Sequence, residues 1–495
     1  MICLGIDCGT QGTKTVALDS DARKIIASAV QSYDVLPGLP PGYIEQYPAT
    51  WTEAVDATVR QVLEQLGPRR QEVRGFGVSG QQHGLVALDA HGQVIRPAKL
   101  WCDTSTFEEC ELLRNHFGGA RFFIDRVGLD MLPGFTAPKI LWLKRREPAN
   151  FARLQTVLLP HDYLNFHLTG KYRMEYGDAS GTALLNVRTR QWQTEILEFI
   201  DAALPAKLPS VGSSRESVGT LKPELAARWN LPREVAVSAG GGDNMMGAIG
   251  TANVAPGRVT ASLGTSGTIY AYSQNPVTDP NGEIAGFCDS TDAWLPLLCT
   301  MNVTVATEAV RNLFGWSLAQ LDAAIGSAPA GTDGLLFLPY LQGERTPNLP
   351  GGCGVFHGLT TRTMKPAWIA RAVMEGVTLG LAYGLERMRQ LGMVPAEIRL
   401  TGGGSKSPVW RQMCADILNC RVVTLAEPEA AALGAALQAL ATVQTSKSIA
   451  AWSGDLVQTQ PAETVEPDKN VQFDYVTARE KHTLLAQTLA RASFL

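Results

Sequence analysis

Long apolar runs are missing from this chain of 495 residues. The most apolar late stretch, AAALGAALQAL at 430–440, is too short and too rich in alanine to cross a bilayer. A strand-like run begins at residue 2 and leaves no length for a signal peptide. We therefore expect a soluble, cytoplasmic protein with no membrane partner.

An excess of positive charge is also missing. The chain has 43 Lys and Arg against 47 Asp and Glu, a formal net charge of −4. No overall basic field is present to hold nucleic acid, so we expect no nucleic-acid partner. An anionic ligand must then be bound by local donors.

Several common motifs are absent. The nine cysteines form no C-x-x-C pair, which argues against a disulfide framework or a zinc site and predicts reduced thiols. The sequence G-x-x-x-x-G-K-[ST] occurs nowhere, and no G-x-G-x-x-G follows the first strand. The chain is therefore neither a Walker ATPase nor a standard dinucleotide-binding protein.

A glycine-rich hairpin motif occurs twice, as DCGTQGT at 7–13 and as LGTSGT at 263–268. Glycines let backbone amides approach a ligand, and successive amides in such a turn form an anion site to which Thr10 and Thr13 add hydroxyls. Asp7 stands at the end of a strand, where it can orient a metal ion or a metal-bound water. One copy could be a plain β-turn with a capping aspartate. Two copies favour loops that hold the phosphates of one ligand.

A carboxylate follows the glycine run of GGGDN at 240–244. Asp243 is expected where a strand ends and a helix begins, and the helix N-terminus would lower its pKa and keep it ionised. An ionised carboxylate near a substrate hydroxyl is a general base. The alternative is that Asp243 only caps the helix.

Polar residues that suit a polyol follow the strand at 73–80. Gln82 and His83 each donate and accept hydrogen bonds, although a lone histidine in a turn is often only solvated at the surface. Trp101 in LWCDTST offers an apolar wall for a sugar face, and Asp103 offers an acceptor. A further run, Gly402 to Gly404, lies between a strand and a helix, where a nucleotide can approach bare backbone.

Strand-like and helix-like segments alternate, which predicts an α/β fold. Helices are expected at 48–66, 302–314, 366–390 and 428–443, and a boundary near 250–258 divides the chain into domains 1–253 and 254–495. After about residue 445 we expect a surface excursion and then a final helix at 475–493.

With these motifs, the chain resembles the FGGY family of carbohydrate kinases over nearly its whole length. The resemblance includes GIDCGTQGTK, SGQQHGLVALD, LWCDTST, GGGDNMMGAIG, SLGTSG, YLQGERTPNLP and TGGGSKSPVWRQM. It implies two actin-like (ribonuclease H-like) ATPase domains with a catalytic cleft between them, and often a homodimer.

The resemblance also implies an activity: ATP-dependent phosphorylation of D-xylulose to D-xylulose 5-phosphate. Asp243 would be the base, and Asp7 would be required for activity through Mg²⁺, bound through water. The ketose would be bound by Gln82, His83 and Asn244, with Trp101 and Asp103 beside them. The nucleotide would be bound by Thr10, Gln11, Gly12, Thr13, Gly264, Thr265, Gly403 and Gly404.

Two alternatives stay open at this stage. A sister kinase would act on another ketose or polyol, such as ribulose or fuculose. An actin-fold ATPase that acts on no sugar would keep the phosphate loops but would not need a polyol pocket near Asp243.

Overall fold

The structure is a computed structural model that describes residues 1–495 apart from the side chain of residue 473. The chain forms two compact units. Unit 1 comprises Met1–Ala255, Tyr272–Leu295 and Glu429–Val457, and unit 2 comprises Pro256–Ala271, Pro296–Pro428 and Gln458–Leu495. The expected α/β class is confirmed. Two segments from later in the chain, Tyr272–Leu295 and Glu429–Val457, pack with unit 1. The expected division into family domains 1–253 and 254–495 is a separate matter and stays a prediction.

The main sheet of unit 1 is built around the first hairpin. Its strand order is β13-β14-β5-β1-β2-β3, and β15 pairs with the end of β5. β1 is antiparallel to β2 and parallel to β5, so β1, β5 and β15 end at one edge of the sheet. The strands are β1 Ile2–Cys8, β2 Gly12–Asp19, β3 Lys24–Ser32, β5 Val73–Gly80, β13 Ser217–Thr220, β14 Ala236–Ser238 and β15 Gly241–Gly242.

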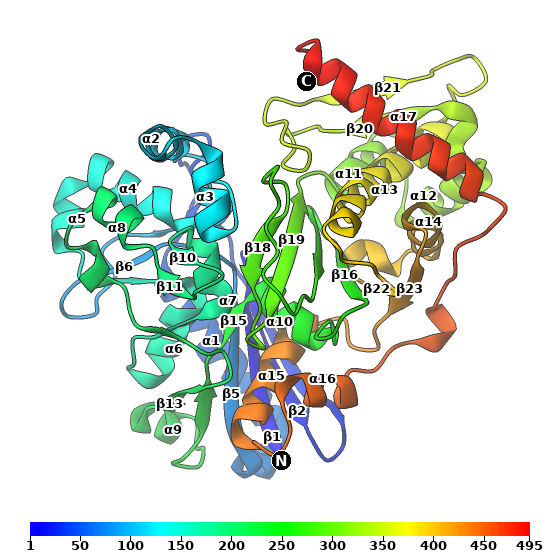
Figure 1. Cartoon of the computed structure of the whole chain (residues 1–495). Coiled ribbons are helices and arrows are strands. Elements are labelled where there is room, and N and C mark those ends of the chain that lie inside the picture. The colour runs from blue at the N-terminus through cyan, green and yellow to red at the C-terminus, as the bar shows by residue number, and fades with distance from the viewer. The chain divides into compact units, whose positions relative to one another are not determined.

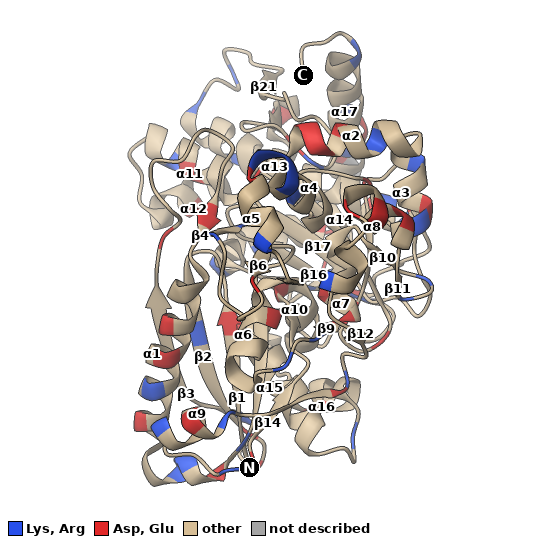
Figure 2. Ribbon diagram, turned by 90° about the vertical axis from the view of Figure 1, so that its left-hand side faces the viewer, with Lys and Arg blue, Asp and Glu red and all other residues tan. Residues whose placement is uncertain are grey.

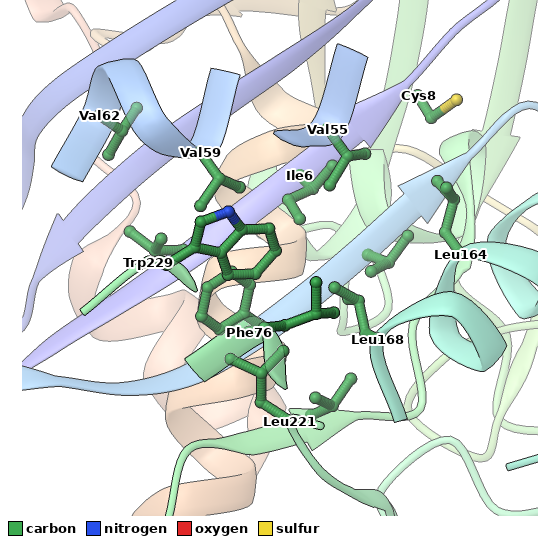
Figure 3. Close-up of a cluster of buried hydrophobic side chains, with 14 of the residues drawn as sticks. Ile6, Cys8, Val55, Val59, Val62, Phe76, Leu164, Leu168, Leu221 and Trp229 are labelled. Atoms are coloured by element: carbon green, nitrogen blue, oxygen red, sulfur yellow. The ribbon is translucent and has the colours of Figure 1, made fainter. Parts of the chain in front are cut away.

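One face of this sheet is covered by helix α1 (Pro48–Leu66), which has the bounds that the sequence predicts. Its apolar residues recur at helical spacing, and Val55, Val59 and Val62 are buried against the strands. Figure 3 shows these valines close to Phe76 and Trp229. The last two rings stack with centroids 5.7 Å apart. This core fixes the strands whose ends carry the site.

The other packing partner of the sheet comes from far along the chain. Helix α15 (Ala430–Val443), orange in Figure 1, lies beside the blue strands β1 and β2. A Cβ at Gly5 would overlap the carbonyl oxygen of Ala432, and a Cβ at Gly77 would overlap that of Ala435. Bare glycines in the strands therefore let an alanine-rich helix approach closely. In the same way α15 packs on α10 (Asp243–Gly250), because Gly250 and Gly434 leave no side chain between the two helices.

The remaining elements of unit 1 form helices and short two-stranded sheets. The helices are α2 Phe107–Phe117, α3 Ala120–Val127, α4 Thr136–Arg146, α5 Pro148–Arg153, α6 Pro160–Thr169, α7 Tyr176–Ala179, α8 Thr194–Ile200, α9 Pro223–Arg228 and α16 Ile449–Leu456. The strand pairs are β4 Glu45–Gln46 with β7 Ala98–Lys99, β6 Val86–Leu88 with β8 Thr156–Leu158, β9 Met174–Glu175 with β12 Val211–Gly212, and β10 Leu185–Asn186 with β11 Gln191–Trp192.

Unit 2 repeats the topology of unit 1. The order β19-β17-β16-β22-β23 corresponds to β3-β2-β1-β5-β14, with the same antiparallel and parallel pairings. Its elements are β16 Arg258–Leu263, β17 Gly267–Ala271, β19 Trp294–Thr300, β20 Leu336–Pro339, β21 Gly354–His357, β22 Glu397–Thr401, β23 Arg421–Thr424, α11 Thr304–Leu313, α12 Leu318–Ser327, α13 Pro366–Gln390, α14 Pro408–Leu418 and α17 Gln472–Arg491.

The segment after residue 445 differs in part from the expectation of a surface excursion. In α16 the side chains of Ile449 and Leu456 are buried in unit 1, and Ser453 Oγ donates to the carbonyl oxygen of Ile249. The apolar positions of this short helix supply enough contact to hold it in the core. Final helix α17 is present, three residues earlier than expected at its start.

Charged residues of both signs are distributed over the elements. Figure 2 shows acidic and basic positions interspersed along α1. Across the described residues, every helix is too short or too polar to span a bilayer.

Candidate active site

Three strand ends bring the first candidate residues together in unit 1. Asp7 lies next to Ser79 in the parallel register of β1 and β5, and Ser79 lies next to Gly241 in that of β5 and β15. Ser79 Oγ donates to Asp7 Oδ1 at 2.7 Å. Asp243 follows β15 directly and begins α10. The sheet therefore places Asp7 and Asp243 at the same edge.

The first hairpin loop turns its carbonyl groups toward the protein. Tyr33 Oη donates to the carbonyl oxygen of Gly9 at 2.8 Å, Gln46 Nε2 donates to that of Thr10 at 2.7 Å, and the Tyr33 amide donates to that of Gln11 at 3.1 Å. This arrangement suits a loop whose amides bind an anion. Gly12 has no left-handed φ, and a Cβ there would lie 2.8 Å from the carbonyl oxygen of Gln31. Close approach, not an unusual backbone conformation, requires this glycine.

The side chain of Thr10 is part of a hydrogen-bond network behind the loop. Its hydroxyl donates to Gln81 Oε1 at 3.0 Å and accepts from Trp101 Nε1 at 3.0 Å. Gln81 Nε2 donates to Gln46 Oε1 at 3.0 Å, which also accepts from Trp51. The indole of Trp101 is therefore fixed beside the loop. Thr13 lies buried and its hydroxyl contacts Tyr33 Oη, so Thr13 supports the loop from below.

The hydrogen bonds that the structure shows for Asp243 both reach one oxygen of its carboxylate. Its Oδ1 accepts from the amide of Asn244 at 2.8 Å and from Asn244 Nδ2 at 3.0 Å. The expectation of a lowered pKa is wrong. Burial, and then the charges of Asp7 and Asp178, raise the pKa of Asp243 to about 7, although Asn244 opposes them. Burial, together with repulsion from the two other carboxylates, here outweighs the helix N-terminus.

Asn244 joins this carboxylate to the residues that follow β5. Its Nδ2 also donates to Gln82 Oε1 at 2.7 Å, and Gln82 Nε2 contacts the sulfur of Met245 at 3.1 Å. Gln82 and His83 are both buried, not solvated at the surface. The structure therefore brings Gln82, Asn244 and Asp243 into one hydrogen-bonded set.

Asp103 has a different role from the one expected. It is fully buried, and each of its oxygens accepts from protein donors: Oδ2 from Lys99 Nζ at 3.0 Å and from the Ile44 amide at 2.9 Å, and Oδ1 from the amide and hydroxyl of Ser105. A buried ammonium needs such a partner. Asp103 is thus committed to Lys99, and we withdraw it as an acceptor for the sugar.

A buried charged cluster next to His83 escaped the sequence reasoning. His161 contacts Asp178 Oδ2 through Nδ1 at 3.0 Å and Asp162 Oδ1 through Nε2 at 2.9 Å. Burial alone would lower the pKa of His161, but the two carboxylates hold it well above its usual value. Burial likewise opposes ionisation of Asp178, yet its contacts with His161 and His83 lower its pKa to about 2. The signal in the sequence was the set of ionisable residues His161, Asp162 and Asp178 on two neighbouring helices, α6 and α7.

The glycine turns of unit 2 present the second set of candidates. The carbonyl oxygens of Gly264 and Thr265 accept from the amides of Thr304 and Val303 at the start of α11, at 3.0 and 3.1 Å. After β22, Gly402 takes a left-handed φ of 83° and packs on the backbone of Leu263. Nothing lies within 4 Å of a Cβ at Gly403, whereas one at Gly404 would press on Trp410.

Comparison with known proteins places the chain in a family. The model of the FGGY family of carbohydrate kinases, N-terminal domain, matches residues 2–250, and that of the C-terminal domain matches residues 259–443.

Relatives and solved structures agree with these matches. The chain is 42% identical over 443 residues to a xylulose kinase of Haemophilus influenzae, covering 88% of this chain and 90% of that protein. It is 36% identical to a xylulose kinase of Escherichia coli, covering 98% and 99%. A solved structure described as a "xyloylose kinase" from Brucella ovis superposes with a TM-score of 0.93 at 32% identity, covering 99% and 100%. The chain therefore belongs to the FGGY family of carbohydrate kinases.

Proposed function

We propose that this chain phosphorylates D-xylulose at its 5-hydroxyl with ATP, giving D-xylulose 5-phosphate and ADP. The relatives named above support the substrate. The observation that carries the proposal is the set formed by Gln82, Asn244 and Asp243, because it joins an amide that can read a polyol to a carboxylate that can accept a proton.

In the proposed reaction Asp243 acts as the general base. A bond forms between the 5-hydroxyl oxygen and the γ-phosphorus, the proton moves to the Asp243 carboxylate, and ADP leaves with the electrons of the broken phosphorus–oxygen bond. Phosphoryl transfer depends mainly on positioning and on charge neutralisation. General-base assistance adds about 10²–10⁴-fold. A pKa of about 7 makes Asp243 both partly ionised and basic near neutral pH.

The proposed ligand contacts divide into a set of residues for the sugar and a set for the nucleotide. Gln82, His83 and Asn244 bind the ketose, and the fixed indole of Trp101 lies against it. Backbone donors of the two hairpins and the bare backbone after β22 bind the nucleotide; these residues are Thr10, Gln11, Gly12, Thr13, Gly264, Thr265, Gly403 and Gly404. The expected hydroxyl donors of the first hairpin are withdrawn, because the Thr10 hydroxyl donates to Gln81 and the Thr13 side chain is buried, so both residues act through their backbone.

The residues present fit a magnesium ion. Burial raises the pKa of Asp7 to about 6, and the charge of Asp7 in turn raises that of Asp243, so a cation would relieve both carboxyl groups. Among the described residues no group of three or more His, Cys, Asp or Glu could hold a metal. Mg²⁺ needs only one or two carboxylates plus waters and substrate phosphates. We assign Asp7 to hold Mg²⁺ through water, and the ion when bound neutralises phosphate charge.

The test is a coupled ADP-release assay over D-xylulose, D-ribulose, L-fuculose, gluconate and glycerol. We expect the highest kcat/KM for D-xylulose. A higher value for another sugar would make the chain a sister kinase, and ATP hydrolysis that no sugar accelerates would favour an ATPase that acts on no sugar. A cytoplasmic location and a homodimer stay predictions.

A further inference from the structure

The backbone of His83 is held in an unusual conformation. Its φ is +60°, in the left-handed region that non-glycine residues rarely adopt. Its carbonyl oxygen accepts from Lys139 Nζ at 2.8 Å and from Thr136 Oγ1 at 3.1 Å. Lys139 is fully buried. Such strain persists only where the surroundings over-determine it, and it concentrates at functional sites.

The imidazole of His83 is enclosed as tightly as its backbone. The ring centroids of Phe135 and Phe287 each lie 5.3 Å from that of His83. Asp178 Oδ1 lies 3.5 Å from His83 Nδ1. Below the ring lies Gly181, and the three atoms nearest to a Cβ built there all belong to the imidazole; two of them would overlap it.

We propose that Gly181 and Asp178 are positioning residues for the sugar site. Gly181 leaves the space that the imidazole of His83 fills, and Asp178 holds the Nδ1 edge so that Nε2, on the opposite edge, meets a hydroxyl of the ketose. This inference rests on the proposed function, because that function gives His83 its contact with the sugar.

The geometry separates this role from a need for glycine in the fold. Gly181 has no left-handed φ, so the backbone accepts alanine. The clash is with the His83 ring alone among the nearest atoms. Asp178 bridges two imidazoles, His83 and His161, and therefore ties the orientation of the first to a fixed, buried partner.

The experiment is a double-mutant cycle between Gly181→Ala and His83→Gly. His83→Gly removes the ring and tolerates the left-handed backbone. We expect Gly181→Ala to raise the KM for D-xylulose about tenfold or more, the effect of one lost hydrogen bond, while the KM for ATP is unchanged. Added to His83→Gly, it should cause no further loss. The matched control is Gly454→Ala, because a Cβ at this exposed helical glycine meets nothing within 4 Å.

An unchanged KM for D-xylulose in a folded, ADP-binding Gly181→Ala variant would overturn the proposal. Losses that multiply in the double variant would also overturn it. If the single variant does not fold, the double variant decides: it folds when the ring is the only obstacle, and its misfolding would show that the fold itself needs the glycine.

A readout without sugar separates this inference from the proposed function. In ¹⁵N-histidine spectra, Asp178→Asn should shift the Nδ1 signal of His83, assigned through His83→Gly, and Gly181→Ala should shift its ring signals. Unmoved signals would contradict the inference. Failure of the wild type to phosphorylate D-xylulose would contradict the proposed function alone.

Discussion

The two hairpins share a topology but differ in what surrounds them. In unit 1 the loop after β1 follows Asp7, and the corresponding position before the loop after β16 is Ser262. In unit 1 the parallel strand β5 leads into Gln82 and His83, whereas in unit 2 the parallel strand β22 leads into Gly402, Gly403 and Gly404. One topology therefore presents acid and polar side chains in one case and bare backbone in the other.

The means of holding the loop also differ. In the first hairpin, carbonyl groups accept from Tyr33 and Gln46 side chains, while in the second they accept from the first amides of α11. Both solutions turn carbonyls into the protein. The difference teaches that one hairpin topology can be held in two ways, and that under the proposed function the residues after the neighbouring strand decide which ligand each unit binds.

The largest expected effect concerns Asp243, the acidic residue that lies at the same sheet edge as the first hairpin of unit 1. Asp243→Ala should lower kcat for D-xylulose about 10²–10⁴-fold, because the transferred proton loses its acceptor. ADP binding by calorimetry should stay close to that of the wild type. Turnover within about threefold of the wild type would remove Asp243 from the base role.

Substitutions at the matched hairpin positions give the next largest effect. Asp7→Asn should lower kcat/KM about 10–100-fold and raise the Mg²⁺ concentration needed for half-maximal rate, since the residue that orients the hydrated ion loses its charge. Ser262→Ala, at the equivalent position of unit 2, should change neither value. Equal losses in both variants would contradict the asymmetry between the hairpins.

The pH profile gives a smaller effect with a definite sign. Without a bound cation the pKa of Asp243 is raised to about 7, and the base acts only when deprotonated, so kcat/KM should fall as pH decreases. A bound Mg²⁺ relieves the carboxyl group and moves this fall below pH 7, although it should stay above the usual pKa of an aspartate. One pH unit below the pKa the rate should be roughly a tenth of its plateau. A profile flat down to the usual pKa of an aspartate would show that burial and the charges of Asp7 and Asp178 do not raise the pKa of Asp243 in the working enzyme.

The smallest expected effect concerns the bare backbone of unit 2. Gly403→Ala should raise the KM for ATP about two- to fivefold, because the new methyl group meets no protein atom within 4 Å and would obstruct only a bound ligand. The thermal midpoint should not change. Gly404→Ala gives the contrast. Its Cβ would press on Trp410, so this substitution should lower the thermal midpoint of unfolding. An unaltered KM for ATP in Gly403→Ala would withdraw this turn from the nucleotide site.

Much of the fold could be read from local patterns. The period of residues 48–66 and 366–390 predicts α1 and α13 with their observed bounds, and glycines after strands predict the loops. The association of α15 with unit 1 could not be read, because a helical pattern does not say which sheet receives the helix. Gly5 and Gly77, inside strands, were the available signal of close approach.

The proximity of candidate residues was predictable where they are neighbours in sequence, as in Gln82 with His83 and Asp243 with Asn244, whereas their roles stay predictions. The site was not predictable where distant elements set the environment. The sequence identifies Asp103 as an acceptor but does not identify its donors. Only the fold shows that Lys99 and the amide of Ile44 donate to its carboxylate. The raised pKa of Asp243 likewise depends on its burial and then on the charges of Asp7 and Asp178, all of which the fold determines.

Phosphorus NMR of the products tests the central claim most directly. With the wild-type chain, Mg²⁺, ATP and D-xylulose, the account predicts ADP and one new phosphate ester on the 5-hydroxyl in equal amounts, formed only when the ketose is present. Release of inorganic phosphate with ADP, at a rate that is the same without D-xylulose, would contradict it.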